Sequence, residues 1–228
     1  MSSRRAFRRG LIACFPIAIS VVPFGVIAAV SANEAGLGTP ATAALSLVVF
    51  AGASQLAALE LAKNDAPALF VIGAALIVNL RFVIYSASLS PRVRGVRRRL
   101  RVVMSYLLTD QAFAVSVPEL DPDDPAKASG VWFFFGAAFS LWFAWQSGTW
   151  IGIVLGTSVP PELSLDFSVA LAFIALTVPH IKSRPALAAA AASIGTFILS
   201  QGLPHGLALI PATFAGIAVG MATEALTS

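Results

Sequence analysis

Long apolar runs that follow one another with only short polar connections are the feature that most limits the fold of this chain. The runs are about 15–27 residues long, and a helix needs about 20 residues to cross the hydrocarbon core of a bilayer. Only 11% of the 228 residues are charged, whereas a soluble domain carries about 25%. This balance excludes both a soluble globule and a disordered chain. The sequence therefore predicts an all-α, polytopic integral membrane protein with a single membrane domain over residues 1–228.

Eight apolar segments can be separated along the chain, and the stretches between them are too short for a soluble domain. A β-barrel is excluded because its strands are alternating segments of roughly ten residues. No internal repeat aligns convincingly between the two halves. The segments span roughly residues 11–31, 41–62, 67–90, 102–118, 130–156, 166–180, 186–202 and 204–223.

Arginines set the expected orientation in the membrane. Four of them lie in residues 4–9 and six in the loop 92–101, and loops rich in Lys and Arg stay in the cytoplasm. Three apolar segments separate these two basic stretches, so one segment must enter and leave on the same face. The best candidate is 41–62, whose centre at 50–55 reads Phe-Ala-Gly-Ala-Ser-Gln. We therefore expect about seven transmembrane helices plus one re-entrant or broken helix, with the acidic loop 119–127 outside.

The N-terminal arginines also resemble a twin-arginine export signal, which is the alternative to a cytoplasmic anchor. The apolar run from Leu11 to Ser31 is longer than the 7–15 residues usual for a signal core. The rest of the chain is also apolar, so there is no soluble cargo to export. The expected arrangement is a cytoplasmic N-terminus.

The interruption within 41–62 is the first candidate binding site. A helix that starts again at Gly52, Ala53, Ser54 and Gln55 would expose backbone N–H groups, which attract an anion such as a carboxylate. Discontinuous helices at the bilayer midplane hold small substrates in many membrane proteins. The alternative is that Gly52 and Ser54 only allow neighbouring helices to pack closely.

Arg81 and Asp110 form the second candidate site. Arg81 lies eleven residues before the 92–101 loop and Asp110 nine residues after it, so antiparallel helices would bring both to about 14–16 Å from the loop. A lone charge at that depth costs at least about 2.5–3.5 kcal/mol, which favours mutual pairing. Tyr85 and Tyr106 lie four residues from Arg81 and Asp110 and should share their helical faces. The pair is either a substrate or proton site or a purely structural ion pair.

Small residues recur at every fourth position in two apolar segments. Such a stripe allows another helix to approach closely, either within this chain or from a partner subunit. The partner contact is expected on the first stripe. The first stripe consists of Gly136, Ser140, Ala144, Gly148, Gly152 and Gly156, and the second of Ala208, Ala212, Gly216 and Gly220.

Four short motifs, taken together, resemble the AzlC family over roughly residues 10–180. The motifs are Pro23-Phe24-Gly25, residues 50–55, Asn79-Leu80-Arg81-Phe82 and Tyr106-Leu107-Leu108-Thr109-Asp110. The resemblance implies the large subunit of an exporter of branched-chain amino acids in the bacterial inner membrane. It also implies a small partner subunit of the AzlD type. The chain departs from the family pattern at Gln111, where an acidic residue is expected, so Asp110 remains as the single acid.

The side chains at these positions suit an apolar amino-acid zwitterion. The break at 52–55, or Arg81, would hold the carboxylate, and Asp110 or free carbonyls at the break would hold the ammonium group. Asn79 is a further expected substrate contact. Apolar side chains would surround the substrate and ionisable groups would carry the proton. The expected apolar pocket comprises Phe24, Phe82 and Phe113, and the expected proton-coupling group comprises Asp110, Tyr106 and Tyr85.

Other functions are less compatible with the sequence. The chain has no phosphate-binding loop, and one Cys with two separated His residues argues against a metal site or other cofactor. The arginines flank apolar helices, so no nucleic-acid partner is expected. The remaining alternatives are a membrane scaffold without transport and an intramembrane hydrolase using Ser54 with His180 or His205. We expect the chain not to be an enzyme.

Overall fold

The computed structural model describes residues 2–121, 129–156, 181, 183–204 and 207–227. The structure is 85% helical, with no strand in the described residues, which confirms the all-α membrane class. The chain divides into two compact units, each described by itself below. One unit comprises Met1–Gln55 and Leu76–Val159, and the other comprises Leu56–Ala75 and Pro160–Ser228.

Three described helices are long and apolar enough to cross a bilayer. They are α1 (Ser3–Glu34), α4 (Ala68–Leu89), which continues into the 3₁₀ helix Ser90–Val93, and α10 (Leu209–Thr227). Helix α7 (Gly130–Gly156) has no charged residue and 27 residues, a length of about 40 Å. Helix α9 (Arg184–Leu199) is shorter. The predicted segment 166–180 lies outside the described residues.

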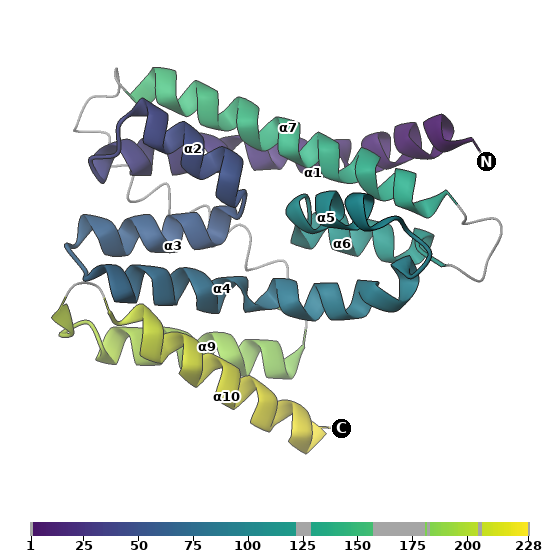
Figure 1. Cartoon of the computed structure of the whole chain (residues 1–228). Helices are drawn as coiled ribbons and strands as arrows, with labels where there is room; N and C mark the ends of the chain where they lie inside the picture. The colour runs from purple at the N-terminus through teal and green to yellow at the C-terminus, as the bar shows by residue number, and fades with distance from the viewer. Residues whose placement is uncertain (1, 122–128, 157–180, 182, 205–206, 228) are drawn as a thin grey trace. The chain divides into compact units, whose positions relative to one another are not determined.

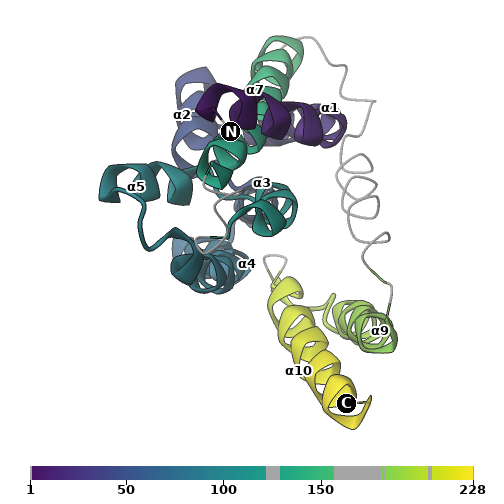
Figure 2. The same cartoon turned by 90° about the vertical axis from the view of Figure 1, so that its right-hand side faces the viewer.

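Helices α1 and α7 lie side by side and run in the same direction, as Figures 1 and 2 show. Their backbones touch at glycines on both helices. A Cβ on Gly25 would lie 2.6 Å from the Trp145 carbonyl oxygen, and one on Gly152 would lie 2.5 Å from the Val26 carbonyl oxygen. The stripe that was expected to receive a partner subunit is therefore occupied by α1 of the same chain. This prediction was wrong because small residues on α1 complement those on α7.

The second stripe is also used within the chain. Helices α9 and α10 pack together, with Gly216 of α10 against Ser193 of α9. A Cβ on Gly220 would lie 3.1 Å from the Ala189 Cβ. The glycines of this stripe thus bring two consecutive helices of the second unit close together.

The predicted interruption of 41–62 is confirmed. Helix α2 (Thr39–Val49) ends at Phe50, which adopts a left-handed conformation with φ 40° and ψ 46°, and α3 (Gly52–Lys63) begins two residues later. The Gln55 side chain donates a hydrogen bond of 2.7 Å to the Leu45 carbonyl. A continuous helix would separate these two residues by about 15 Å, so the chain reverses direction at the break.

A second reversal occurs within 102–118, which was expected to cross the membrane as one helix. That prediction was wrong: α5 (Arg98–Tyr106) and α6 (Asp110–Ser116) are separated by Leu107–Thr109. Asp110 at the start of α6 contacts Arg81, while the Leu120 carbonyl accepts a hydrogen bond of 3.0 Å from Arg92. Helix α6 therefore returns in the direction of the end of α4, toward the face from which α5 came.

Contacts around Glu119 place four segments on one face. The Arg9 guanidinium forms an ion pair of 2.8 Å with Glu119, and Gly130 at the start of α7 packs against the Glu119 backbone. Arg92 donates a hydrogen bond to the carbonyl of Leu120, the residue after Glu119. The two basic stretches, residues 4–9 and 92–101, therefore share a face, as expected. The acidic loop 119–127 was expected on the opposite face. Its described part, residues 119–121, lies instead with the arginines, because the α5–α6 hairpin does not cross.

These elements form a repeat that the sequence does not show by alignment. Helix α1 runs away from the arginine face and is followed by the α2–α3 hairpin, whereas α4 runs toward that face and is followed by the α5–α6 hairpin. Each hairpin breaks after an aromatic residue, Phe50 or Tyr106, and has a polar residue and a glutamine four and five positions later. Residues 3–63 and 68–116 thus share one order of elements, a long helix followed by two shorter helices with a break between them.

Candidate functional site

The tips of the two hairpins meet at the middle of α7. The rings of Phe50 and Tyr106 are 6.0 Å apart between centroids. The Tyr106 hydroxyl donates to the Leu47 carbonyl at 2.5 Å and accepts from the Trp142 indole at 3.0 Å. Tyr106 thus joins one hairpin to the other and both to α7.

Three carbonyl groups near the end of α2 accept hydrogen bonds from side chains. Gln55, Gln146 and Tyr106 donate to the carbonyl oxygens of residues 45, 46 and 47, respectively. The last four carbonyls of a helix have no partner within it, and in the bilayer they must be satisfied by protein or water. The expectation that free carbonyls at the break bind an ammonium group is therefore weakened.

A buried polar cluster, missed in the sequence, fixes α2 against α7. The Ser46 hydroxyl contacts Gln146 Oε1 at 3.2 Å and the Thr149 hydroxyl at 2.9 Å, and it accepts from the Trp145 indole at 2.8 Å. All these side chains are buried. The available sequence signal was the presence of Gln146 and Thr149 in an otherwise apolar helix.

The start of α3 has the opposite character to the end of α2. Residue 51 at its N-cap is an alanine, which has no side-chain acceptor, and no hydrogen bond in the described part of the chain engages the N–H groups of Gly52, Ala53 or Ser54. Ser54 Oγ is itself a donor, to the Ala51 carbonyl at 2.9 Å. The break therefore offers donors rather than acceptors, which suits an anion. Close packing also applies, because a Cβ on Gly52 would lie 2.6 Å from the Trp145 ring.

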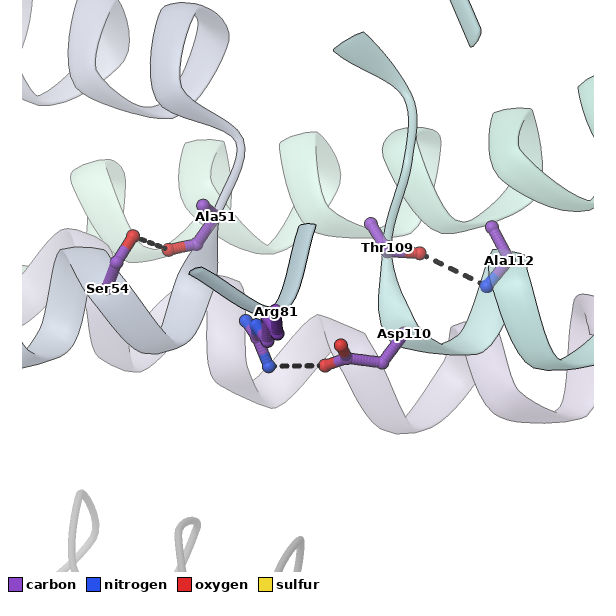
Figure 3. A network of polar contacts seen from close by, with 6 residues as sticks. All are labelled: Ala51, Ser54, Arg81, Thr109, Asp110 and Ala112. Carbon is purple, nitrogen blue, oxygen red and sulfur yellow. Dashed lines mark hydrogen bonds and ion pairs between the residues drawn. The ribbon is translucent and has the colours of Figure 1, made fainter. Parts of the chain in front are cut away.

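Arg81 and Asp110 are paired, as predicted. Arg81 Nη1 lies 2.5 Å from Asp110 Oδ2, and both side chains are about one-third exposed. Figure 3 shows the two side chains pointing toward one another, with Thr109 accepting a hydrogen bond from the Ala112 N–H beside them. Thr109 is thus the N-cap of α6, and it holds Asp110 in the first turn of this helix.

Several polar atoms of the predicted site residues are buried without a hydrogen-bond partner. Six such side-chain atoms occur in the described part of the chain, and four of them belong to predicted residues. Buried polar groups are normally satisfied, so this concentration is typical of a site that receives a polar ligand or water. The four atoms are Gln55 Oε1, Asn79 Oδ1, Arg81 Nε and Asp110 Oδ1.

Aromatic rings surround the ion pair. The Arg81 guanidinium lies over the Phe82 ring at 5.1 Å, and Tyr85 stacks on Phe113 with centroids 4.5 Å apart. Phe82 and Tyr85 also contact each other edge to face. Two of the three phenylalanines of the predicted apolar pocket are thus at the pair.

One expectation about the site is wrong, and a second is not tested by these contacts. Tyr106 was expected on the same helical face as Asp110, and this was wrong because the helix breaks between them. Phe24 belongs to α1, and none of the ring contacts found in the described residues includes it. His180 and His205 lie outside the described residues, and no described group of three His, Cys, Asp or Glu residues could hold a metal ion.

Comparisons with known proteins agree with the membrane character of the chain. The family model described as AzlC protein matches residues 16–159. An uncharacterized membrane protein of Archaeoglobus fulgidus is 29% identical over 194 residues, which cover 83% of this chain and 82% of that protein. Inner membrane protein YgaZ of Escherichia coli K12 is 26% identical over 195 residues, which cover 83% and 79%. No solved structure matches the chain.

Proposed function

We propose, because the chain belongs to the AzlC family, that it is a secondary exporter of branched-chain amino acids. The observation that carries the proposal is the Arg81–Asp110 pair, in which each group keeps one buried polar atom without a partner. An amino acid is a zwitterion, so it can offer a carboxylate to the arginine and an ammonium group to the aspartate. Charge balance within the membrane is then kept while the substrate is bound.

The two sides of the α2–α3 break also support an orientation in which the substrate carboxylate, rather than its ammonium group, faces the break. Free N–H groups at residues 52–54 add to the attraction for a carboxylate. The α2 carbonyls at residues 45–47 already accept hydrogen bonds from side chains. Asp110 is therefore the proposed partner of the ammonium group, and the rings of Phe82 and Phe113 the proposed contacts of the apolar side chain.

Proton coupling is proposed to occur at Asp110. An intramembrane carboxylate is a usual proton carrier in transporters. Protonation would remove its charge, weaken its bond to Arg81 and release an ammonium group held on the other oxygen. Tyr85 stacks on Phe113, three residues after Asp110, and is the proposed neighbour in this step, whereas Tyr106 is proposed to act at the hairpin tips.

The family membership also supports a small AzlD-like partner subunit and a location in the inner membrane, with the arginine face in the cytoplasm. Both small-residue stripes make contacts inside the chain, at Gly152 and at Gly216. The proposed partner must therefore bind elsewhere on the chain.

The decisive experiment measures efflux of radiolabelled leucine from proteoliposomes that contain the complex of this chain with its partner. Efflux should accelerate when the proton gradient is directed into the vesicles, so that protons enter as leucine leaves. Asp110→Asn should abolish this acceleration because the amide cannot carry a proton. Asp65→Asn, in a connection between helices, is the matched control and should behave like the wild type.

Two results would contradict the proposal. Proton-driven efflux that survives Asp110→Asn would remove Asp110 from the coupling step. A stable, folded complex that moves no leucine or related amino acid under any gradient would favour a scaffold.

A further inference from the structure

An open pocket lies on the arginine face between the end of α4 and α5. Its volume is about 330 Å³, which is within the range of small-molecule sites. Arg98 and Arg101 line it from the first turn of α5, and Ser86 and Ser90 line it from the end of α4. The ion pair of the proposed transport site does not line this pocket.

The polar side of the pocket is built for an oxyanion. The guanidinium groups of Arg98 and Arg101 are exposed and make no hydrogen bond or ion pair with the described residues. The hydroxyl groups of Ser86 and Ser90 likewise have no partner there. Because the start of a helix carries partial positive charge, the first turn of α5 adds to the attraction. Phosphate oxygens are among the acceptors that arginine binds with pairs of hydrogen bonds.

The other side of the pocket is apolar and reaches into the membrane. Leu89, Met104 and Leu108 line it and are buried, whereas Val102 lines it and is 63% exposed. From Arg98 to Tyr106, α5 covers about 13 Å of depth. A free phosphate ion would use only the arginine end, so the apolar wall requires a ligand with a hydrocarbon part.

We propose that this pocket binds an anionic phospholipid, with its phosphate between Arg98 and Arg101 and an acyl chain along Val102 and Met104. Basic pockets between membrane helices are known to hold acidic headgroups. The site is independent of the transport function proposed above. It would tie the base of the α5–α6 hairpin to one leaflet of the membrane.

Native mass spectrometry of the purified chain in detergent, titrated with phosphatidylglycerol, tests the proposal. Arg98→Gln with Arg101→Gln should lower the affinity at least about tenfold, since two charge-assisted contacts are lost. Arg94→Gln with Arg99→Gln is the matched control: it removes the same charge from the same loop, from exposed residues that do not line the pocket. The control should change the affinity by less than about twofold, because Arg94 and Arg99 do not line the pocket and exposed charges are partly screened by salt.

Ser90→Trp tests whether the lipid occupies the pocket itself, because it fills the pocket without removing an arginine. This variant should also lose phosphatidylglycerol, while its thermal unfolding stays that of the wild type. Equal weakening by both arginine pairs, or unchanged binding by Ser90→Trp, would overturn the proposal in favour of diffuse surface charge. Equal affinity for phosphatidylcholine, or displacement by inorganic phosphate at similar concentration, would overturn it as well.

Discussion

Arg81 and Asp110 show how two charged residues can be both a structural link and a binding site. Their contact neutralises charges that would each cost about 2.5–3.5 kcal/mol if left alone at the centre of a membrane helix. One nitrogen and one oxygen of the pair nevertheless remain buried without a partner. A contact made only for stability would be expected to satisfy all its polar atoms.

Removing either charge should therefore have a different effect from removing both. Arg81→Ala and Asp110→Ala should each lower the yield of folded protein and abolish leucine efflux, because the remaining charge is left alone in the membrane. The double variant should regain folding, by roughly the 2.5–3.5 kcal/mol of the lone charge, but not efflux. Gel-filtration yield and vesicle efflux measure the two effects, and efflux by the double variant would mean that the pair is only structural.

Removing one atom, the Tyr106 hydroxyl oxygen, tests whether this group holds the two hairpin tips together. Tyr106→Phe keeps the ring that contacts Phe50 but removes the hydroxyl shared by Leu47 and Trp142. Loss of these two hydrogen bonds should lower the free energy of unfolding by about 1–3 kcal/mol. Thermal unfolding in detergent gives the value, with Tyr85→Phe as comparison. An unchanged unfolding curve would show that the hydroxyl does not hold the tips together.

The glycine contacts between α1 and α7 explain how a pair of helices can pack without a hydrophobic driving force. Lipid tails are as apolar as leucine, so helices in a bilayer associate through close backbone contact and polar groups. Gly25 and Gly152 allow the close backbone contact between α1 and α7. The buried polar cluster around Ser46 supplies the polar contact between α2 and α7. This packing fixes the level at which the hairpin tips meet.

A methyl group added at this contact should be costly. Gly152→Ala would bring a Cβ within 2.5 Å of the Val26 carbonyl oxygen and 2.8 Å of the Ala29 Cβ, and such overpacking costs about 1–3 kcal/mol. Gly195→Ala is the matched control, because nothing lies within 4 Å of its added Cβ. The control should be neutral or stabilising by up to about 1 kcal/mol, as alanine favours the helix. Equal unfolding temperatures for both variants would refute the contact.

The sequence predicts the break in the α2–α3 hairpin but not the break in the α5–α6 hairpin. Gly52 and Ser54 within an apolar run, together with the arginine count on either side, were enough to predict the first break. Leu107 and Leu108 in the second break are apolar and without glycine or proline, so hydropathy predicts a continuous helix. The only local signal was Thr109 as a capping residue before an acidic first turn. The hydrogen bonds of Tyr106 with Leu47 and Trp142, which one sequence does not reveal, hold the chain at this reversal.

At the scale of the whole molecule, the hairpins change which face each connection occupies. Hydropathy alone predicts that segments 41–62 and 102–118 each cross the membrane. In the structure each segment is a hairpin whose two ends lie on the same face. The charge rule was still informative, since the arginines at 4–9 and 92–101 share a face. It failed for the acidic residues at 119–121, because acidic side chains contribute little to orientation.

Single cysteines introduced in a variant without Cys14 should report this topology. Gly38→Cys and Asn64→Cys should react with an impermeant thiol reagent from one side of the membrane, and Gly95→Cys from the other. Asp121→Cys should react from the same side as Gly95→Cys, because the α5–α6 hairpin does not cross. Labelling of position 121 together with position 38 would instead restore a crossing through 102–118.

The side chains that satisfy the end of α2 also set the order in which the protein can be completed during synthesis. Ser46 and Gln146 are 100 residues apart, which the ribosome needs roughly 5–20 s to add at typical rates. Until α7 emerges, the Ser46 carbonyl lacks its Gln146 donor, and the hairpin must wait beside the translocation machinery or in water. A chain that ended before residue 146 would lack this donor to the Ser46 carbonyl. The hydrogen bonds that fix α2 can thus form only after the Gln146 and Thr149 part of α7 has been synthesised.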